Sequence, residues 1–177
     1  MRMISDFDDL DAEFDLLKSM VRSAGRPMSF SLAQGITDHG WRQVLNKIEG
    51  ASNSGLAMRG QVAPRPIGIL LGLTTTLAPF TTRPSFSEVA GLPLAERAVA
   101  LADPARKARI LAEQTGPGFM RLFRLMDEGR KIWLMTDPPN YEPDPADSLN
   151  AQALRRGVDP WSYIYDALLQ IDGKALL

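Results

Sequence analysis

Segments with helical periodicity alternate with short strand-like segments in the amino-terminal part of the chain. Over residues 6–24, apolar side chains recur every three or four positions, which predicts a helix with one buried face. A strand is predicted over residues 28–33, a second helix over about residues 38–54, and a second strand over residues 56–62. Because this alternation with short loops is typical of a parallel sheet covered by helices, we expect an α/β fold.

Residues that begin and end helices frame these segments. Ser5 is expected to cap the first helix, while Gly25 and Gly55 are placed to end the first and the second. Further along the chain, Asp103 and Asp159 each precede a proline. Both Asp-Pro pairs are expected to open helices, because proline is tolerated in the first turn.

The carboxyl-terminal part of the chain predicts one more strand and two more helices. The strand is expected over residues 131–135. Asp147 or Ser148 is expected to cap the helix that follows, and Gly157 to end it. The final segment, "DGKALL", has the pattern of the entry to a further apolar strand.

Composition limits the class of protein and its partners. The chain has 177 residues, of which 45% are hydrophobic and 23% charged, as expected for one globular domain with a real core. With a net charge of −1 and no long Lys/Arg run, we expect no nucleic-acid partner. No apolar run is long enough to cross a membrane. The acidic first residues do not look like a secretory signal, so we expect a cytoplasmic protein.

The chain is poor in the side chains that most often hold zinc or perform nucleophilic catalysis. It has no cysteine and one histidine, His39. Structural and catalytic zinc sites use mainly Cys and His ligands. A Ser-His-Asp arrangement would need His39 itself, and a capping or solvent-exposed role for that histidine is the more ordinary interpretation. The residues therefore identify neither a metal site nor a catalytic group.

A stiff elbow follows the second predicted strand in the stretch "MRGQVAPRPIGILLGL". Pro64 and Pro66 bracket Arg65, and each proline restricts its own backbone and that of the preceding residue. A guanidinium held in this way suits a carboxylate, which it can bind through two parallel hydrogen bonds. It can equally well tie down backbone carbonyls or an acidic side chain, and the sequence leaves both roles open.

Two carboxylates, Asp137 and Glu142, follow the strand predicted over residues 131–135. Catalytic groups of α/β barrels lie at the carboxyl ends of the strands, which is where these residues would be. The surrounding "TDPPNYEPDP" is also rich in proline and would serve as a stiff turn. Both interpretations stay open at this point.

Several consecutive blocks of the chain resemble amidohydrolase family 3, the group that includes the N-acyl-D-amino-acid deacylases (D-aminoacylases). The blocks are "SFSLAQ", "GQVAPRPIGILLGL", "PSFSEVAGLPLAERAVALADPARKARILAE" and "NYEPDPADSLNAQALRRGVDPWSYIYDALLQIDGKALL". The resemblance runs over nearly the whole chain and keeps the order of the blocks. It implies a metal-dependent (β/α)8 TIM barrel that hydrolyses the amide C–N bond of a small-molecule substrate, with zinc activating the attacking water.

The family's metal site does not transfer to this chain residue by residue. The resemblance implies a His-x-His motif before the first of these residues and a metal-binding aspartate after the last of them. The two strand ends that match the middle of the barrel carry Gln34 and Gln61, and a neutral amide is a poor zinc ligand. We therefore expect Arg65, Gln61 and Gln34 to contact substrate, and we expect no metal to bind to these residues alone.

The expected organisation is a single partial barrel domain over residues 1–177. Residues 1–66 would form two βα units, residues 67–128 a helical insertion or lid, and residues 129–177 a strand with two helices. A part of a barrel leaves strand edges open, so we expect self-association or pairing with the missing barrel segments. The chain is expected to be inactive alone; a non-catalytic binding or scaffold domain derived from the same fold is the alternative.

Overall fold

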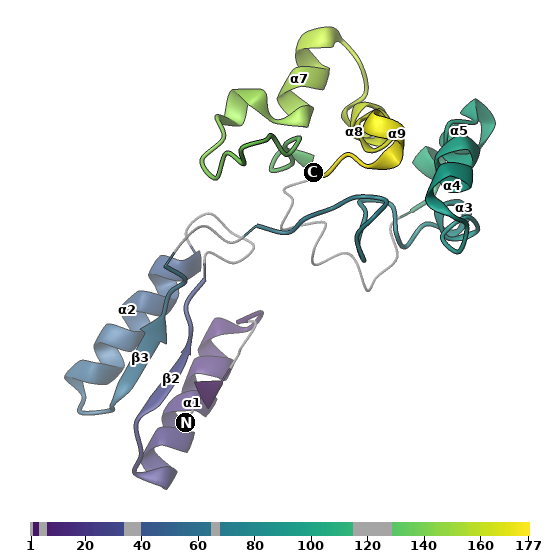
Figure 1. Cartoon of the computed structure of the whole chain (residues 1–177). Helices are drawn as coiled ribbons and strands as arrows, with labels where there is room; N and C mark the ends of the chain where they lie inside the picture. Colours follow the sequence, from purple (N-terminus) through teal and green to yellow (C-terminus); the bar gives the residue numbers. More distant parts are fainter. Residues whose placement is uncertain (1, 4–6, 34–39, 65–67, 115–128) are drawn as a thin grey trace. The chain divides into compact units, whose positions relative to one another are not determined.

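The computed structural model of the chain describes residues 2–3, 7–33, 40–64, 68–114 and 129–177. The chain divides into two compact units (Figure 1), which we call unit 1 (Met1–Ile67) and unit 2 (Gly68–Leu177). Among the described residues, no helix has the length and apolar character needed to cross a membrane. The finer division expected from the sequence, into residues 1–66, 67–128 and 129–177, stays a prediction.

Unit 1 is built around three parallel strands in the order β1-β2-β3 (Figure 1). The strands are β1 (Arg2–Met3), β2 (Met28–Ser31) and β3 (Met58–Gln61). Helix α1 (Leu10–Ala24) connects β1 to β2, and α2 (Gly40–Asn53) connects β2 to β3. The expected parallel sheet is confirmed by this pairing, whereas the partial (β/α)8 barrel with a helical insertion stays a prediction.

The start of α1 differs from the sequence prediction. The helix begins at Leu10 and not near Asp6, so the prediction that Ser5 caps it is wrong. Asp9 is the cap: its carboxylate accepts a hydrogen bond of 3.1 Å from the backbone N–H of Ala12. The carboxylate of Glu13 in turn accepts a 3.1 Å bond from the N–H of Asp9, so two helix-end donors are satisfied. At the other end, Gly25 has the left-handed backbone expected of a helix stop.

Both helices of unit 1 pack on the same face of the sheet. In β2 and β3, Met28, Phe30 and Met58 are buried, and they share one apolar cluster with α1 and α2. The helices contribute Phe14, Leu17, Val21, Val44, Ile48 and Ala51. Because strand side chains alternate between faces, the intervening residues Ser29, Ser31, Arg59 and Gln61 lie on the opposite face. That face carries no described helix.

Unit 2 is mostly helical in its described part. Its helices surround an apolar core that includes Phe80, Ile164 and Tyr165. They are α3 (Pro84–Ser87), α4 (Leu94–Leu101), α5 (Pro104–Ala112), the short 3₁₀ helix η3 (Pro145–Asp147), α7 (Leu149–Arg156), α8 (Pro160–Leu168) and α9 (Gln170–Gly173).

The helix caps expected in unit 2 are confirmed. Asp103 and Asp159 cap α5 and α8 through their side chains, each with a proline at the next position. Of the two candidates before α7, Ser148 is the cap, because its hydroxyl accepts a 3.2 Å bond from the N–H of Ala151. Gly157 ends α7 in the left-handed conformation.

The strand predicted over residues 131–135 is wrong. These residues are not paired as a strand, although Ile132 is buried in the core of unit 2. The backbone N–H of Met135 donates to the carbonyl of Leu176 (2.8 Å), and the carbonyl of Ile132 accepts from Leu149 (2.8 Å). Strand formation requires a neighbouring strand over several residues, and a single bond to the last residues of the chain does not supply one.

The end of the chain is likewise less regular than its apolar pattern predicts. Leu71 and Leu177 exchange two backbone hydrogen bonds of 2.9 and 2.8 Å, and Gly72 forms one isolated antiparallel bridge with Leu176. The short α9 that precedes this contact includes Ile171 and Asp172, both with φ of 54°. The predicted strand entry is therefore a single bridge after a left-handed turn.

Candidate functional site

The structure describes one of the three residues that the sequence predicts to bind substrate. Gln61 is the last residue of β3 and is exposed. It pairs in register with Ser31, the last residue of β2, so the carboxyl ends of these two strands lie side by side. Arg65 and Gln34 fall outside the described residues, as does His39, and their predicted roles stay predictions.

In β2 and β3, four polar side chains lie on the sheet face opposite the helices, and we call them the polar sheet face: Ser29, Ser31, Arg59 and Gln61. Ser29 pairs with Arg59 and Ser31 pairs with Gln61, so the two pairs form two rows across neighbouring strands. Neighbouring strands are about 4.8 Å apart, and successive rows on one face about 6.7 Å. On β2 and β3, one cation and three uncharged hydrogen-bonding groups thus lie side by side, and Arg2 of β1 is in register with Ser29 in the first row.

Arg59 is the charged member of this face and is exposed. Its side chain forms no hydrogen bond or ion pair with another residue among those that the structure describes. The sequence prediction missed Arg59, although a signal was present. An arginine between Met58 and Gly60, in a strand whose other face is buried, must point away from the helices.

The carboxylates Asp137 and Glu142 lie in an exposed turn-rich segment of unit 2. The N–H of Glu142 donates to the side-chain oxygen of Asn140 (3.0 Å), which is a local turn contact. Within the described parts of the chain, no three His, Cys, Asp or Glu side chains gather closely enough to hold a metal ion. The contact at Glu142 is that of a stiff turn, one of the two interpretations that the sequence leaves open.

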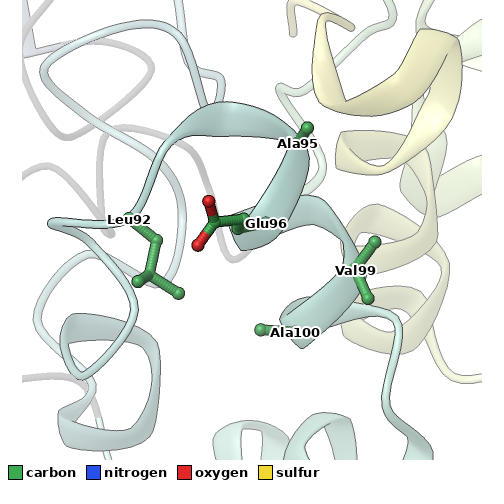
Figure 2. A pocket seen from close by; sticks show the side chains of 5 residues that line it. All are labelled: Leu92, Ala95, Glu96, Val99 and Ala100. Carbon is green, nitrogen blue, oxygen red and sulfur yellow. The ribbon is translucent and has the colours of Figure 1, made fainter.

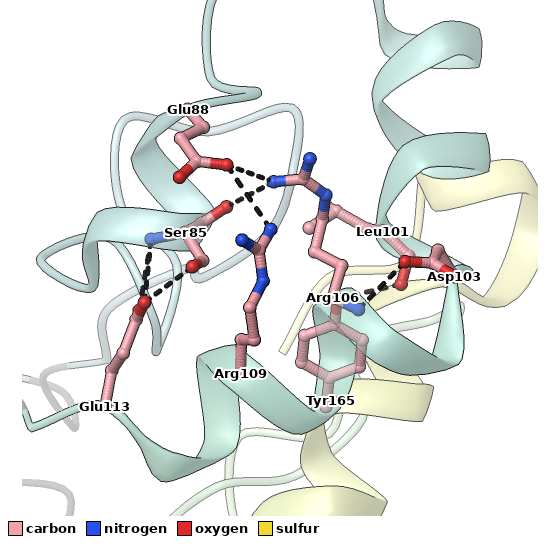
Figure 3. A network of polar contacts seen from close by, with 8 residues as sticks. All are labelled: Ser85, Glu88, Leu101, Asp103, Arg106, Arg109, Glu113 and Tyr165. Carbon is pink, nitrogen blue, oxygen red and sulfur yellow. Dashed lines mark hydrogen bonds and ion pairs between the residues drawn. The ribbon is translucent and has the colours of Figure 1, made fainter.

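A dense polar network in unit 2 connects α3 and α5 (Figure 3). The carboxylate of Glu113, at the end of α5, accepts bonds from the backbone N–H of Ser85 (3.1 and 3.2 Å) and from its hydroxyl (2.5 Å). Arg106 donates to the carbonyl of Ser85 (2.9 Å) and to the carboxylate of Glu88 (2.7 Å). Each of these groups is occupied by a partner, so the network holds the helices together and offers no free nucleophile.

Arg83, at the start of α3, makes a second contact with the end of α5. Its guanidinium donates to the carbonyls of Ile110 (2.6 Å) and Leu111 (3.3 Å) in the last turn of α5. It also lies over the ring of Phe80, 4.9 Å from the centroid. Burial lowers the pKa of Arg83, and the charge of Glu113 acts against that change. Arg83 and Glu113 therefore cap each other's helices, which is a structural role.

Two surface hollows lack the groups that a catalytic site needs. The first, along α4, has a volume of about 470 Å³ and is lined by Leu92, Ala95, Glu96, Val99 and Ala100 (Figure 2). Among the described residues that line it, Glu96 is the only polar one, and general acid-base catalysis requires a second converging group.

The second hollow lies between α1 and α2 and is lined partly by Lys18, Arg22 and Lys47. Lys18 pairs with Asp15 (2.6 Å) and Lys47 pairs with Asp11. The hydrogen bond and charge of Lys18 lower the pKa of Asp15. Two of the three cations are therefore already neutralised, and this hollow is a weaker anion site than the polar sheet face.

Tyr165 gives the one large pKa shift among the described residues. Its hydroxyl donates to the carbonyl of Leu101 at the end of α4 (2.8 Å), and its side chain is 1% exposed. Burial raises the pKa of Tyr165 from 10.0 to about 12. This tyrosine is a structural link between α4 and α8, because its hydroxyl is held by a helix-end carbonyl.

Stability is expected to fall with alkaline pH because of Tyr165. The unfolded state loses the phenol proton first, so stability is complete below pH 10 and declines up to about pH 12. A shift of this size corresponds to about 3 kcal/mol. Urea unfolding between about pH 8 and about pH 12 should show a smaller alkaline decline for Tyr165→Phe than for the parent. The control Tyr141→Phe, which removes a hydroxyl from a 63% exposed side chain, should follow the parent; an identical decline in Tyr165→Phe would contradict this expectation.

Among known proteins, no family model, no curated protein and no solved structure matches this chain.

Proposed function

We propose that this chain forms part of a metal-dependent (β/α)8-barrel hydrolase that cleaves the amide C–N bond of N-acyl-D-amino acids or related small amides. Several sequence blocks resemble amidohydrolase family 3 and follow one another in the same order as in that family, which supports the proposal. The observation that carries it is the polar sheet face. In unit 1, α1 and α2 cover one face of parallel strands, while Arg59 and Gln61 lie on the other. A barrel has this arrangement, with helices outside and substrate near the carboxyl ends of the strands.

Alternative α/β architectures agree less well with this face. In a doubly wound sheet, helices cover both faces, and the strands read as nearly continuous apolar runs. Here β2 reads Met-Ser-Phe-Ser and β3 reads Met-Arg-Gly-Gln, so that each strand is apolar on one face and polar on the other.

The residues present do not fit a zinc site, and no chemical step through a metal is derived for them. Zinc prefers thiolate and imidazole ligands, and the chain has no cysteine and one histidine. Gln61, at the end of β3, has an amide that can donate to a substrate oxygen and accept from a substrate N–H. The proposal therefore gives these residues the binding of substrate and expects the chain to be inactive alone.

A chimera tests this proposal directly. The middle block of a zinc-dependent N-acyl-D-amino-acid deacylase is replaced by the 177 residues of this chain. The chimera is expected to retain zinc and to release free amino acid from N-acetyl-D-amino acids, whereas the chain alone with added zinc is expected to release none. In the active chimera, Gln61→Ala should lower kcat/KM by about tenfold or more, because a buried substrate polar group loses its partner.

A matched variant separates this loss from a general effect of mutation. Gln43 is exposed on α2, on the helical side of the sheet, so Gln43→Ala should leave kcat/KM unchanged. A folded, zinc-loaded chimera that hydrolyses no N-acyl-amino acid would overturn the proposed reaction. If such a chimera still bound an amide ligand, the non-catalytic binding domain would be the better description.

A further inference from the structure

The small hollow between α1 and α2, on the helical side of the sheet in unit 1, is lined by three cationic side chains, and we call it the cationic hollow. Lys18 and Arg22 lie one helical turn apart on α1, and Lys47 comes from α2. The other lining residues are Phe14, Gly50, Ala51 and Ser54. Since no acidic side chain lines it among the described residues, the wall of the cationic hollow is electropositive.

The three cations are not needed to cap the end of α2. The carbonyl of Ala51 accepts hydrogen bonds from the N–H and the hydroxyl of Ser54 (3.1 and 2.8 Å) and from the N–H of Leu56 (3.0 Å). The carbonyl of Gly50 accepts a bond from the N–H of Ser54 (3.2 Å). Because these helix-end acceptors already have donors, the cations of the hollow are available to other acceptors.

The acidic partners of the two lysines are more exposed than the lysines themselves. Lys18 pairs with Asp15 and Lys47 pairs with Asp11, but neither carboxylate lines the hollow. The lysine side chains are 29 and 31% exposed, whereas those of Asp15 and Asp11 are 68 and 84% exposed. Ion pairs with such exposed partners contribute about 1 kcal/mol or less, so another anion can compete for the ammonium groups. Arg22 forms no hydrogen bond or ion pair within the described parts of the chain.

The cationic hollow has room for a phosphate group and a few further atoms. Its volume of about 220 Å³ equals that of about seven water molecules in the liquid. Three cations that approach from two helices suit a tetrahedral oxyanion, whose oxygens point in different directions, better than a planar carboxylate. A ligand with two negative charges also gains more from these cations than the single charge of Asp11 or Asp15 does.

We infer that Lys18, Arg22 and Lys47 bind the phosphate group of a small ligand in the cationic hollow. The hollow lies on the helical side of the sheet, whereas the polar sheet face lies on the other side. The phosphate site is therefore separate from the residues of the proposed function and does not depend on it. Because both helices contribute to the site, a bound phosphate group stabilises unit 1.

The test measures binding of three probes to the 177-residue chain by calorimetry and NMR titration at constant ionic strength. The probes are inorganic phosphate, glycerol 3-phosphate and, as the singly charged comparison, acetate. At about pH 8 the phosphate ester is a dianion, because its second pKa is about 6. At least one phosphate probe is expected to bind about tenfold or more tightly than acetate. The tighter of the two identifies the source of the phosphate group as the free ion or an ester.

Substitution of Arg22 locates the bound phosphate. Arg22→Gln should weaken binding of the preferred phosphate probe about tenfold while leaving the circular dichroism spectrum unchanged, and Arg22→Lys should keep part of the affinity. Arg26→Gln is the matched control, because Arg26 is exposed between α1 and β2 and does not line the hollow. This variant removes the same charge from unit 1 and should keep the affinity of the parent.

Three results would each overturn the inference. The first is no saturable binding of either phosphate probe, or affinity no higher than that for acetate. The second is equal weakening in Arg22→Gln and Arg26→Gln, which would show a general effect of charge and no defined site. The third is a loss of binding in Arg59→Gln but not in Arg22→Gln, which would place the phosphate group on the polar sheet face.

Discussion

Replacing Arg83 with alanine is expected to lower the free energy of unfolding of unit 2 by about 3 kcal/mol. The side chain is 6% exposed, and its guanidinium satisfies the carbonyls of Ile110 and Leu111 at the end of α5. Its removal leaves both carbonyls without this donor, opens a gap over Phe80 and leaves Glu113 without a nearby opposite charge. Glu113→Gln should cost less, because the amide oxygen can still accept from Ser85.

Tryptophan fluorescence measures this loss in unit 2 alone when Trp41 is removed. Two of the three tryptophans, Trp133 and Trp161, belong to unit 2, and Trp161 contacts Phe80 with a centroid distance of 5.9 Å. Urea unfolding is therefore followed in a Trp41→Phe background. The control is Arg109→Ala, whose guanidinium is exposed and lies 3.6 Å from Glu88, so about 0.5 kcal/mol or less should be lost. Equal losses in the two variants would contradict the reciprocal capping of α3 and α5.

Replacing Phe30 with alanine is expected to destabilise unit 1 by about 3–5 kcal/mol. Phe30 is 1% exposed in the middle strand of the sheet. Its ring lies 5.5 Å from that of Phe7 and 6.2 Å from that of Phe14, so the substitution opens a cavity between β2 and α1. Because unit 1 has its own apolar cluster, the effect should be confined to unit 1.

Hydrogen exchange followed by mass spectrometry gives the location of this effect. Peptides from residues 7–33 and 40–64 should lose protection in Phe30→Ala, whereas peptides from residues 129–177 should keep it. Ser29→Ala is the matched control, since it alters the same strand on the opposite face and should change stability by about 0.5 kcal/mol or less. A uniform loss of protection over both units would show that they unfold as one cooperative body.

Helix caps are the part of this protein that the sequence predicts best. Asp103 and Asp159 before prolines, Ser148 before α7, and Gly25 and Gly157 at helix ends all have their expected roles. A cap depends on bonds within one turn of the chain, so the residue types nearby are sufficient to predict it. The prediction that Ser5 caps α1 was wrong because the helix starts later in the chain. There the carboxylates of Asp9 and Glu13 accept hydrogen bonds from backbone N–H groups at the helix start.

The functional prediction from sequence reached only part of the candidate site. Gln61 was identified through the resemblance to amidohydrolase family 3, which matches it to a strand end, and in the structure it is exposed at the end of β3 beside Ser31. Arg59 was overlooked, because its neighbours in the sequence say which face it is on but not which residues of another strand are beside it. Strand register brings Ser29 and Arg59 together across about 30 residues of chain, and register follows from packing of the whole sheet.

By itself, the sequence determined the two helices of unit 1, the residues that cap α5, α7 and α8, and the alternation that makes a parallel sheet, since each of these depends on residues a few positions apart. Only the tertiary structure decided that residues 131–135 are not a strand, that Arg83 and Glu113 cap each other's helices, and that Arg59 has a polar neighbour on β2. Those features depend on partners distant in the chain, and such partners become neighbours only when the apolar clusters of each unit form.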